Sequence, residues 1–321
     1  MANPAEKLCN ICVIGSINMD LVVRSPRFAK SGETLTAHSW DRVPGGKGAN
    51  QAVALARLGA RTTFCGCIGN DVFGELLRAN LVRENANVAN LIVNSEVGSG
   101  VAMIIVDDAG RNSIYVVGGA NHTLRDSDIR KLAPVIQASH FVLLQLEIPC
   151  EANLEVIKIA RENGVQVLLD PAPVPADRFP EALLQVDLLS PNATEAEMLT
   201  GIAVRDAANA KEAAKSLAAR GCQRVVIKLG ERGALALEKN GQAWHIPAAP
   251  VDVIDTTAAG DAFSAALAFS LAHGKDLVAA TQVACAAGAV AVGRAGAQPS
   301  MPTLREVEVL LSKYEFCPRL L

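Results

Sequence analysis

One turn of this chain reads Asp255-Thr256-Thr257-Ala258-Ala259-Gly260-Asp261, and a long apolar helical pattern follows it directly over residues 262–271. The start of a helix leaves several backbone N–H groups without partners and carries partial positive charge, so it suits an anion. The three small residues before Asp261 have no bulk that would keep a phosphate away from those groups. Asp261 is then either a general base beside the anion or an ordinary N-cap of the helix.

The composition excludes several classes of protein. The 321 residues allow one large α/β domain or two domains, and 50% hydrophobic with 20% charged residues indicates a sizeable core rather than disorder. A net charge of -3 without a lysine or arginine block gives no footprint for nucleic acid or for an acidic membrane. We therefore expect neither nucleic acid nor membrane as a partner.

No apolar run reaches the length of a membrane span, because the run at 262–271 is interrupted soon afterwards by His273, Lys275 and Asp276. Residues 1–7 are polar and lead straight into a predicted strand, which is unlike a signal peptide. The expected location is the cytoplasm.

Eight cysteines raise the question of a metal site or disulfides. Cys9 and Cys12 form a C-x-x-C, but positions three apart on a strand point to opposite faces and cannot share a metal. Cys65 and Cys67 share a face but have no second pair at zinc-site spacing. Buried free thiols are the favoured interpretation.

Extended segments with a polar face precede the first helix. Residues 8–15 read as a buried strand. In the segment 16–24, polar and apolar residues then alternate through Val22, which places Asn18 and Asp20 on one face. Residues 33–43 also look extended, and 100–106 with 111–117 form a hairpin pattern. We expect these pieces, within 16–43 and 96–121, to form a small antiparallel β lid outside the main body.

A glycine-rich segment, Pro44-Gly45-Gly46-Lys47-Gly48-Ala49-Asn50, opens the first predicted helix. Its glycines allow close approach of a ligand to the backbone. It is not a Walker A loop, because Lys47 has the wrong spacing and no Ser or Thr follows it, and no G-x-G-x-x-G follows the first strand. A dinucleotide site of the nicotinamide type therefore has little support.

From residue 122 onward, predicted strands and helices alternate, beginning with a helix near 126–137, with a hairpin near 233–247 and a closing helix near 303–313. An earlier strand is predicted near 62–68. This alternation predicts the α/β class, with a mostly parallel central sheet and helices on both faces, over residues 1–15, 44–95 and 122–321. Ligands of such sheets bind beyond the carboxyl ends of the strands. Polar residues at these predicted ends are Glu147, Asp170, Asn192, Glu195 and the segment 230–233.

The chain resembles the ribokinase-like (PfkB) family of carbohydrate kinases over nearly its whole length. The resemblance rests on eight motifs in the family's order: Gly15-Ser16-Ile17-Asn18-Met19-Asp20, Gly45-Gly46-Lys47-Gly48-Ala49-Asn50-Gln51-Ala52, Gln145-Leu146-Glu147, Asp170-Pro171-Ala172-Pro173, Pro191-Asn192-Ala193-Thr194-Glu195, Lys228-Leu229-Gly230-Glu231-Arg232-Gly233, the turn at 255–261, and Gly296-Ala297-Gln298-Pro299-Ser300.

The resemblance implies ATP-dependent phosphoryl transfer to a sugar, expected to be the 5-hydroxyl of D-ribose, giving ribose 5-phosphate and ADP. Asp261 would be the base, and the backbone N–H groups of Ala258, Ala259, Gly260 and Asp261 would form the anion hole. Sugar hydroxyls need donors and acceptors together. The residues that match the family's sugar contacts are Asn18, Asp20, Gly46, Lys47, Asn50 and Glu147, with Asp261.

The resemblance also implies sites for ATP, Mg²⁺ and an activating K⁺. The expected ATP contacts are Asn192, Lys228, Leu229, Gly230, Glu231, Arg232, Gly233, Gly260 and, in a variable position, Cys285. Glu195 belongs to an Asn-x-x-Glu element tied to magnesium, although Asn192 and Glu195 also fit a capping box. The expected monovalent-cation loop contains Asp255, Thr257, Ala291, Arg294, Gly296 and Ser300.

Exposed lid strands need covering, which favours a homodimer formed through the lid. Two alternative functions also remain open. The preferred acceptor could instead be deoxyribose, another sugar or a nucleoside. From a different class, a sugar-binding sensor without catalysis would have no need of the Ala-Ala-Gly-Asp base motif.

Overall fold

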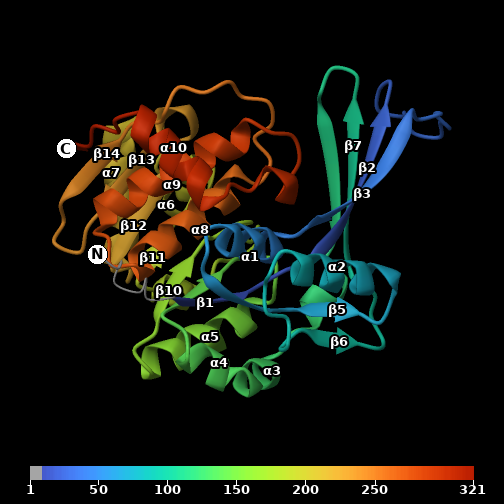
Figure 1. Ribbon diagram of the computed structural model, residues 1–321, viewed down its shortest axis with the longest axis horizontal. Coiled ribbons are helices and arrows are strands. Elements are labelled where there is room, and N and C mark those ends of the chain that lie inside the picture. Colours follow the sequence, from blue (N-terminus) through green and yellow to red (C-terminus); the bar gives the residue numbers. More distant parts are fainter. Residues whose placement is uncertain (1–8) are drawn as a thin grey trace, which may run out of the picture.

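A nine-stranded sheet forms the centre of the larger part of the molecule (Figure 1). The structure is a computed structural model, and it describes residues 9–321. Residues 1–7, which we expect not to be a signal peptide, lie outside the described residues. Six strands are parallel neighbours, in the order β4 (Arg61–Cys65), β1 (Asn10–Ile14), β9 (Phe141–Leu144), β10 (Gln166–Leu169), β11 (Leu188–Leu189) and β12 (Arg224–Lys228). The sheet continues in antiparallel fashion through β13 (Ala234–Leu237), β14 (Ala243–Ile246) and β15 (Arg319–Leu320).

Helices cover both faces of this sheet, as expected for parallel strands that are buried on both sides. One face carries α1 (Lys47–Arg57), α2 (Val72–Arg83), α8 (Ala259–Ala272), α9 (Leu277–Val292) and α10 (Leu304–Lys313). The other carries α3 (Asp126–Lys131), α4 (Ala133–Gln137), α5 (Cys150–Glu162), α6 (Ala193–Thr200) and α7 (Ala207–Ala219). Short 3₁₀ turns lie at Gly119–Thr123, Glu181–Leu184, Gly230–Arg232 and Gln298–Ser300.

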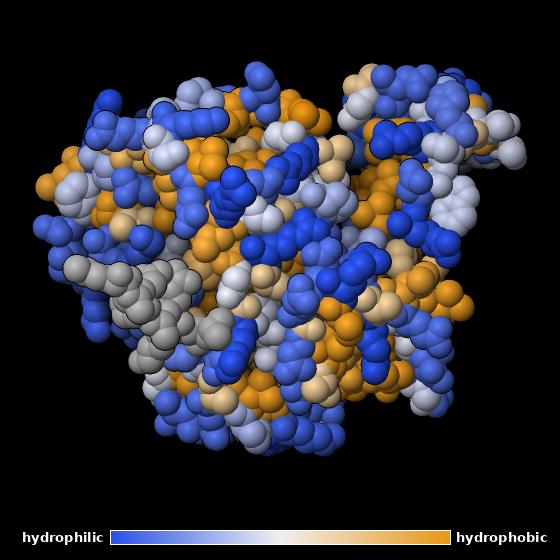
Figure 2. Space-filling view, in the orientation of Figure 1, coloured by the Kyte–Doolittle hydropathy of each residue, from blue (hydrophilic) through white to orange (hydrophobic). Residues whose placement is uncertain are grey.

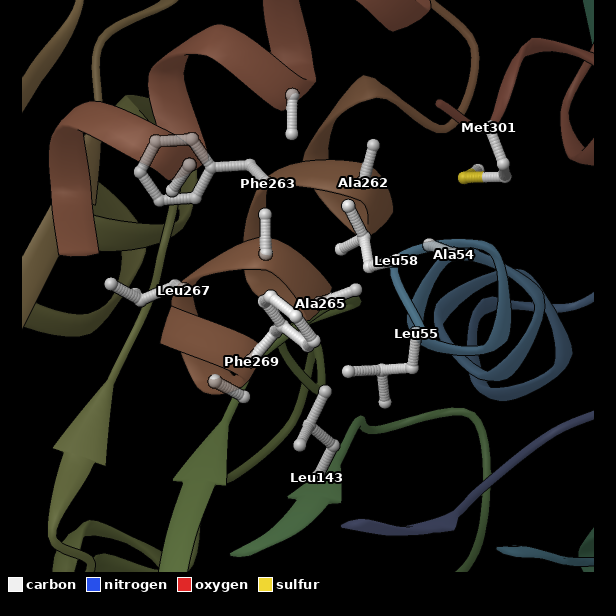
Figure 3. Close-up of a cluster of buried hydrophobic side chains, with 14 of the residues drawn as sticks. Ala54, Leu55, Leu58, Leu143, Ala262, Phe263, Ala265, Leu267, Phe269 and Met301 are labelled. Atoms are coloured by element: carbon white, nitrogen blue, oxygen red, sulfur yellow. The ribbon is translucent and has the colours of Figure 1, made fainter. Parts of the chain in front are cut away.

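Alternate strand residues point into two separate cores. On β9, Phe141 and Leu143 join the core of α1 and α8, while Val142 and Leu144 join the opposite core. Figure 3 shows Leu55 and Leu58 of α1 facing side chains of α8 such as Ala265. Because α8 is rich in alanine, α1 and the sheet approach it closely, and this packing sets the position of its first turn.

The lid is a four-stranded sheet that projects away from the body (Figure 1). Its order is β3 (Ser39–Gly45), β2 (Asn18–Ser25), β7 (Gly100–Asp107), β8 (Asn112–Val117). The pairs β2–β3 and β7–β8 are antiparallel, whereas β2 and β7 run parallel. The predicted fold class is confirmed, and the division of the chain into the two predicted domains stays a prediction.

Several element boundaries differ from the sequence-based expectations. The strand predicted near 62–68 is broken at Gly66, after which β5 (Cys67–Gly69) pairs with β6 (Ile92–Asn94) in a separate two-stranded sheet. A Cβ on Gly66 would lie 2.8 Å from the Gly15 carbonyl oxygen, so the chain turns where no side chain fits. The helix predicted near 126–137 is two helices, because Pro134 opens a new first turn.

The thiol expectation is confirmed for most cysteines. Free thiols at Cys12, Cys65, Cys67, Cys222 and Cys285 are buried, whereas Cys317 is exposed. Over residues 9–321, no group of three or more His, Cys, Asp or Glu side chains is arranged to hold a metal ion. None of the helices in that range combines the length and hydropathy needed to cross a membrane.

Candidate active site

Polar residues from four parallel strands meet at one edge of the large sheet. Ser16 follows β1, Glu147 follows β9, Asp170 follows β10 and Asn192 follows β11. The carboxyl ends of parallel strands share an edge, which is where α/β sheets bind their ligands. The first turns of α1 and α8 bring Lys47 and Asp261 to the same edge.

The first turn of α8 has no side-chain cap. Its N-cap residue is Ala258, which adopts a left-handed backbone with φ 58°, and Asp261 lies within the first turn. Asp261 therefore does not cap the helix. The Ala259 N–H donates to the Thr256 carbonyl at 3.3 Å, while among residues 9–321 no hydrogen bond is recorded for the N–H groups of Gly260 and Asp261. These groups fit an anion.

The carboxylate of Asp261 is buried and held by two amides. Its Oδ2 accepts a hydrogen bond from Asn50 Nδ2 at 2.9 Å, and its Oδ1 accepts one from Gln51 Nε2 at 3.3 Å. Burial raises the pKa of Asp261 to about 6, with a further increase from the negative charge of Asp170, while Lys47 acts in the opposite direction. The side chain is therefore ionised at neutral pH yet remains a competent proton acceptor.

Lys47 is the central cation of this edge. Burial disfavours its charged form, but the negative charges of Asp261, Asp170, Glu147 and Glu195 outweigh that cost and raise the pKa of Lys47 above its usual value. The Lys47 backbone N–H also donates to Glu147 Oε2 at 3.0 Å. One ammonium thus sits among carboxylates from four different elements.

Most of the predicted sugar contacts surround Lys47. Glu147 also accepts a hydrogen bond from the Ser16 hydroxyl, and burial, together with the charge of Glu147, raises the pKa of Asp20 to about 7. Asn50 Oδ1 is buried without a partner among the described residues, so it is free to bind a hydroxyl. Gly46 precedes α1 with φ 87°, and a Cβ there would lie 2.8 Å from the Asn18 backbone N.

Asn18 lies at the base of the lid, where β2 leaves the body. Its Oδ1 accepts a hydrogen bond from Asn121 Nδ2 at 2.8 Å, and Asn121 Oδ1 accepts from the Ile17 N–H at 2.9 Å. The register pairs Asn18 with Gly45 and Gly100, the last and first residues of the neighbouring strands. The lid therefore carries Asn18 and Asp20 on the strand nearest to the Lys47 cluster.

The predicted Asn-x-x-Glu element forms a capping box on α6. Asn192 Oδ1 accepts from the Glu195 N–H at 2.8 Å, and Glu195 Oε2 accepts from the Asn192 N–H at 2.7 Å. The capping interpretation is thus confirmed. Burial raises the pKa of the Glu195 carboxyl group, while the positive charges of Lys228 and Lys47 act to lower it.

The predicted nucleotide segment follows β12. Lys228 Nζ forms an ion pair with Asp170 Oδ1 at 2.9 Å and lies 3.5 Å from the Ser264 hydroxyl. The segment then turns through Gly230, Glu231 and Arg232, all exposed, to Gly233. Leu229 and Cys285 are buried in the two opposite cores, and burial raises the pKa of the Cys285 thiol to about 12.

The two predicted cation-binding segments lie side by side. Asp255 Oδ1 accepts hydrogen bonds from the N–H and hydroxyl of Thr257, and its Oδ2 accepts from the Gly296 N–H at 2.8 Å. Arg294 pairs with Glu306, the Ala291 carbonyl accepts from the Arg294 N–H at 3.2 Å, and the Ser300 hydroxyl donates to the Ala297 carbonyl. Asp255 therefore ties the turn before α8 to the loop after α9.

Comparison with known proteins identifies the family of this fold and site. The model of the pfkB family of carbohydrate kinases matches residues 9–304, which covers every element from β1 to the start of α10. The chain belongs to the pfkB family of carbohydrate kinases.

Individual members of the pfkB family match over nearly the full length. A ribokinase of Haemophilus influenzae is 40% identical over 297 residues, which cover 92% of this chain and 96% of that protein. A deoxyribokinase of Salmonella typhi is 35% identical over 306 residues, which cover 95% of this chain and 100% of that protein. The structure of Arabidopsis thaliana ribokinase complexed with ribose and ATP is 34% identical, with a TM-score of 0.88 over 96% of this chain and 99% of that one.

The structure also brings forward residues to which the pfkB-family motifs assigned no role. Gln51 contacts both Asp261 and Asp170, Ser264 donates to Asp170 at 2.8 Å, and Asn121 holds Asn18. Gln51 and Asp170 lie inside the quoted motifs, but only the fold shows which side chains they meet. Nothing in the sequence around Ser264 or Asn121 pointed to the site.

The raised pKa of Asp261 predicts a pH-dependent gain in stability from Asp261→Asn. A folded-state pKa of about 6, against the ordinary value of 3.8 for an aspartate, means that the folded protein binds more protons than the unfolded chain between these values, so stability falls as pH rises through that window. Without ligands, the stability of the variant relative to the unaltered protein should therefore be greater at pH 8 than at pH 5, by about 1.4 kcal/mol.

Urea unfolding at pH 5 and pH 8 measures this difference. Asp252→Asn, at an exposed position in the loop before α8, is the matched control and should change little at either pH. An equal effect of Asp261→Asn at both pH values would contradict the raised pKa.

Proposed function

We propose that the protein is an ATP-dependent sugar kinase that phosphorylates the 5-hydroxyl of D-ribose, giving D-ribose 5-phosphate and ADP. The observation that carries the proposal is the buried Asp261 carboxylate, one residue from the unpartnered Gly260 N–H and hydrogen-bonded to Asn50. A proton acceptor thereby stands beside an anion site. The ribokinase and deoxyribokinase relatives support a pentose as the acceptor.

Asp261 takes the proton from the sugar hydroxyl as that oxygen attacks the transferred phosphoryl group. With a pKa of about 6, the carboxylate is ionised at neutral pH and needs no prior deprotonation. The N–H groups at the start of α8 face the charge on the phosphoryl oxygens, and their fixed orientation costs no reorganisation during the transfer. Asp261 thus acts on the attacking sugar hydroxyl, and the start of α8 acts on the phosphoryl group that it attacks.

The sugar is held by groups that accept and donate hydrogen bonds in turn. Asp20 and Glu147 are acceptors when ionised, the Lys47 ammonium donates, and the unpartnered Asn50 Oδ1 accepts. Asn18 and Asp20 come from the lid, so the sugar contacts the lid and the body together. A free polyhydroxylated pentose matches this density of polar groups better than an apolar acceptor does.

ATP is proposed to lie along the segment after β12 and over the start of α8. The exposed glycine turn at Gly230 offers backbone groups to the nucleotide, and Lys228 lies near Gly260, 3.7 Å from the position of a Cβ there. Leu229 would contribute through its backbone, since its side chain is buried.

Mg²⁺ is proposed to be held indirectly, near Glu195. Both Glu195 oxygens already accept hydrogen bonds from Asn192, which fits a metal that keeps several of its own waters. When bound with the nucleotide, Mg²⁺ neutralises phosphate charge. K⁺ is proposed to occupy the two segments joined by Asp255, since a cation there would lie just before the first turn of α8.

Both cation proposals predict an ion dependence of the rate. Turnover should stop when Mg²⁺ is chelated, and it should rise several-fold when K⁺ replaces choline at constant ionic strength. Asp255→Asn should weaken the K⁺ response while retaining the Mg²⁺ requirement, because it loosens the joined segments. A rate that is independent of K⁺ in the unaltered protein would refute the monovalent site.

A homodimer formed through the lid is proposed from its exposed edge. On β8, Ile114, Tyr115, Val116 and Val117 are all more than half exposed, and Figure 2 shows apolar surface near the base of the lid. An exposed edge strand with this composition favours pairing with another chain.

The cytoplasmic location expected from the sequence stays a prediction.

Light scattering at micromolar concentrations should give twice the 33.6 kDa mass of one chain. Tyr115→Glu should shift the protein toward the monomer, since it places a charge in the paired surface. Val309→Glu, at an exposed apolar position on α10, is the control and should leave the mass unchanged. A monomer across the whole concentration range would overturn the proposal.

A coupled assay of ADP formation with a panel of acceptors tests the proposed reaction. D-ribose should give the highest kcat/KM, ahead of deoxyribose, hexoses and nucleosides. The Salmonella typhi deoxyribokinase makes deoxyribose the specific competitor. A higher kcat/KM for any other acceptor would assign the enzyme to that sugar instead.

The same assay with Asp261→Asn separates a kinase from a sugar-binding sensor. Removing the base should lower kcat by about 10²- to 10⁴-fold, while ribose binding measured by calorimetry persists. A sensor would bind ribose equally well in both proteins and form no ADP in either.

A further inference from the structure

We propose that Gln51 is a positioning residue of the kinase reaction: its side-chain amide holds the carboxylates of Asp261 and Asp170 together and fixes the orientation of Asp261 for proton transfer. This inference rests on the proposed role of Asp261 as the base. The resemblance to the family assigned no task to Gln51, although it lies next to the predicted sugar contact Asn50.

The geometry of Gln51 is that of a bridge. The side chain is fully buried, and Nε2 lies 3.3 Å from Asp261 Oδ1 and 3.3 Å from Asp170 Oδ2. A primary amide has two N–H donors, so one group serves both carboxylates. The three residues come from α1, from the end of β10 and from α8, and the bridge therefore joins elements far apart in the sequence.

Gln145 determines which end of the Gln51 amide faces the carboxylates. Gln145 Nε2 donates to Gln51 Oε1 at 2.6 Å, so the oxygen of Gln51 points toward Gln145 and its nitrogen toward the two aspartates. The reversed amide would set an oxygen against two carboxylates. Gly15 leaves room for this arrangement, because a Cβ there would lie 1.9 Å from Gln145 Oε1.

Charged groups surround Asp261 on several sides. Lys47 faces it from α1, Asp170 from the end of β10, and Glu147 from the end of β9. Lys228 of β12 pairs with Asp170, and the Ser264 hydroxyl also donates to Asp170. The neutral amide of Gln51 thus stands between two carboxylates and offsets their mutual repulsion by donating a hydrogen bond to each.

The two oxygens of Asp261 have different partners. Oδ2 is held by Nδ2 of Asn50, whose unpartnered Oδ1 is the predicted sugar contact, whereas Oδ1 of Asp261 is held by the fully buried Gln51, which has no predicted contact with the sugar. Gln51 therefore holds Asp261 independently of the predicted sugar contacts. Without it, Asp261 rotates and its protonated form is favoured.

The pH dependence of kcat/KM for D-ribose tests this role, because its acid limb reports the pKa values of Asp261 and of the sugar contact Asp20 in the free enzyme, and only the pKa of Asp261 should change in the variants below. Gln51→Met keeps the bulk but removes both donors, so kcat should fall at least tenfold and the acid limb should move to higher pH. Asp170→Asn removes the negative charge that raises the pKa of Asp261, so its acid limb should move to lower pH. Opposite shifts are the signature of the bridge.

Two further variants complete the test. Gln145→Met leaves Gln51 in place but frees its amide to rotate, and it should shift the acid limb in the same direction as Gln51→Met, by a smaller amount. Gln223→Met removes an exposed bond of the same type, from Nε2 to Asp187 Oδ1 at 3.1 Å, and should leave the profile unchanged. An unshifted acid limb in Gln51→Met, with or without a loss of kcat, would overturn the proposal.

Carboxyl-carbon NMR titration of Asp261 in the unliganded protein gives the same answer without turnover. The pKa of Asp261 should be higher in Gln51→Met and lower in Asp170→Asn than in the unaltered protein, and equal values in all three would overturn the bridge. If the unaltered protein phosphorylates no acceptor, the proposed function fails, while this titration still decides the role of Gln51.

Discussion

A single buried ammonium compensates the carboxylates on which the site is built. Lys47 interacts with Asp261, Asp170, Glu147 and Glu195, which reach it from α8, from the ends of two strands and from α6. Burying several acids together costs free energy through desolvation and repulsion, and one central cation reduces both costs. The glycines on either side of Lys47 let α1 approach β1 and β2 closely enough for its ammonium to reach this position.

The sequence predicted those parts of the structure that rest on local chemistry. Alternating strand and helix patterns gave the parallel sheet, and small residues before Asp261 gave the open start of α8. The motifs placed Lys47, Asn50 and Glu147 in one site, and the structure brings them together around Asp261. The inferences on the fold succeeded because helix starts and strand ends are decided by a few adjacent residues, whereas the grouping of Lys47, Asn50 and Glu147 came from the family motifs.

Long-range partners could not be predicted in this way. Gln51 and Asp261 are separated by 210 positions, and no periodicity tells which carboxylate a buried amide will meet. The parallel pairing of β2 with β7 depends on a connection that runs through the body, whereas a hairpin pattern predicts only antiparallel neighbours. Likewise, Asn192 and Glu195 satisfied two interpretations of one pattern, and only their reciprocal hydrogen bonds identified the cap.

Ala258 occupies the N-cap of α8 in a left-handed conformation, with no side-chain oxygen to offer the N–H groups behind it. Elsewhere in the chain, Asp71, Asp206 and Asp276 supply that oxygen from within the protein. At α8, these N–H groups are left for the anion that we propose to bind there, so a phosphoryl group would do for this helix what a side-chain oxygen does for the others.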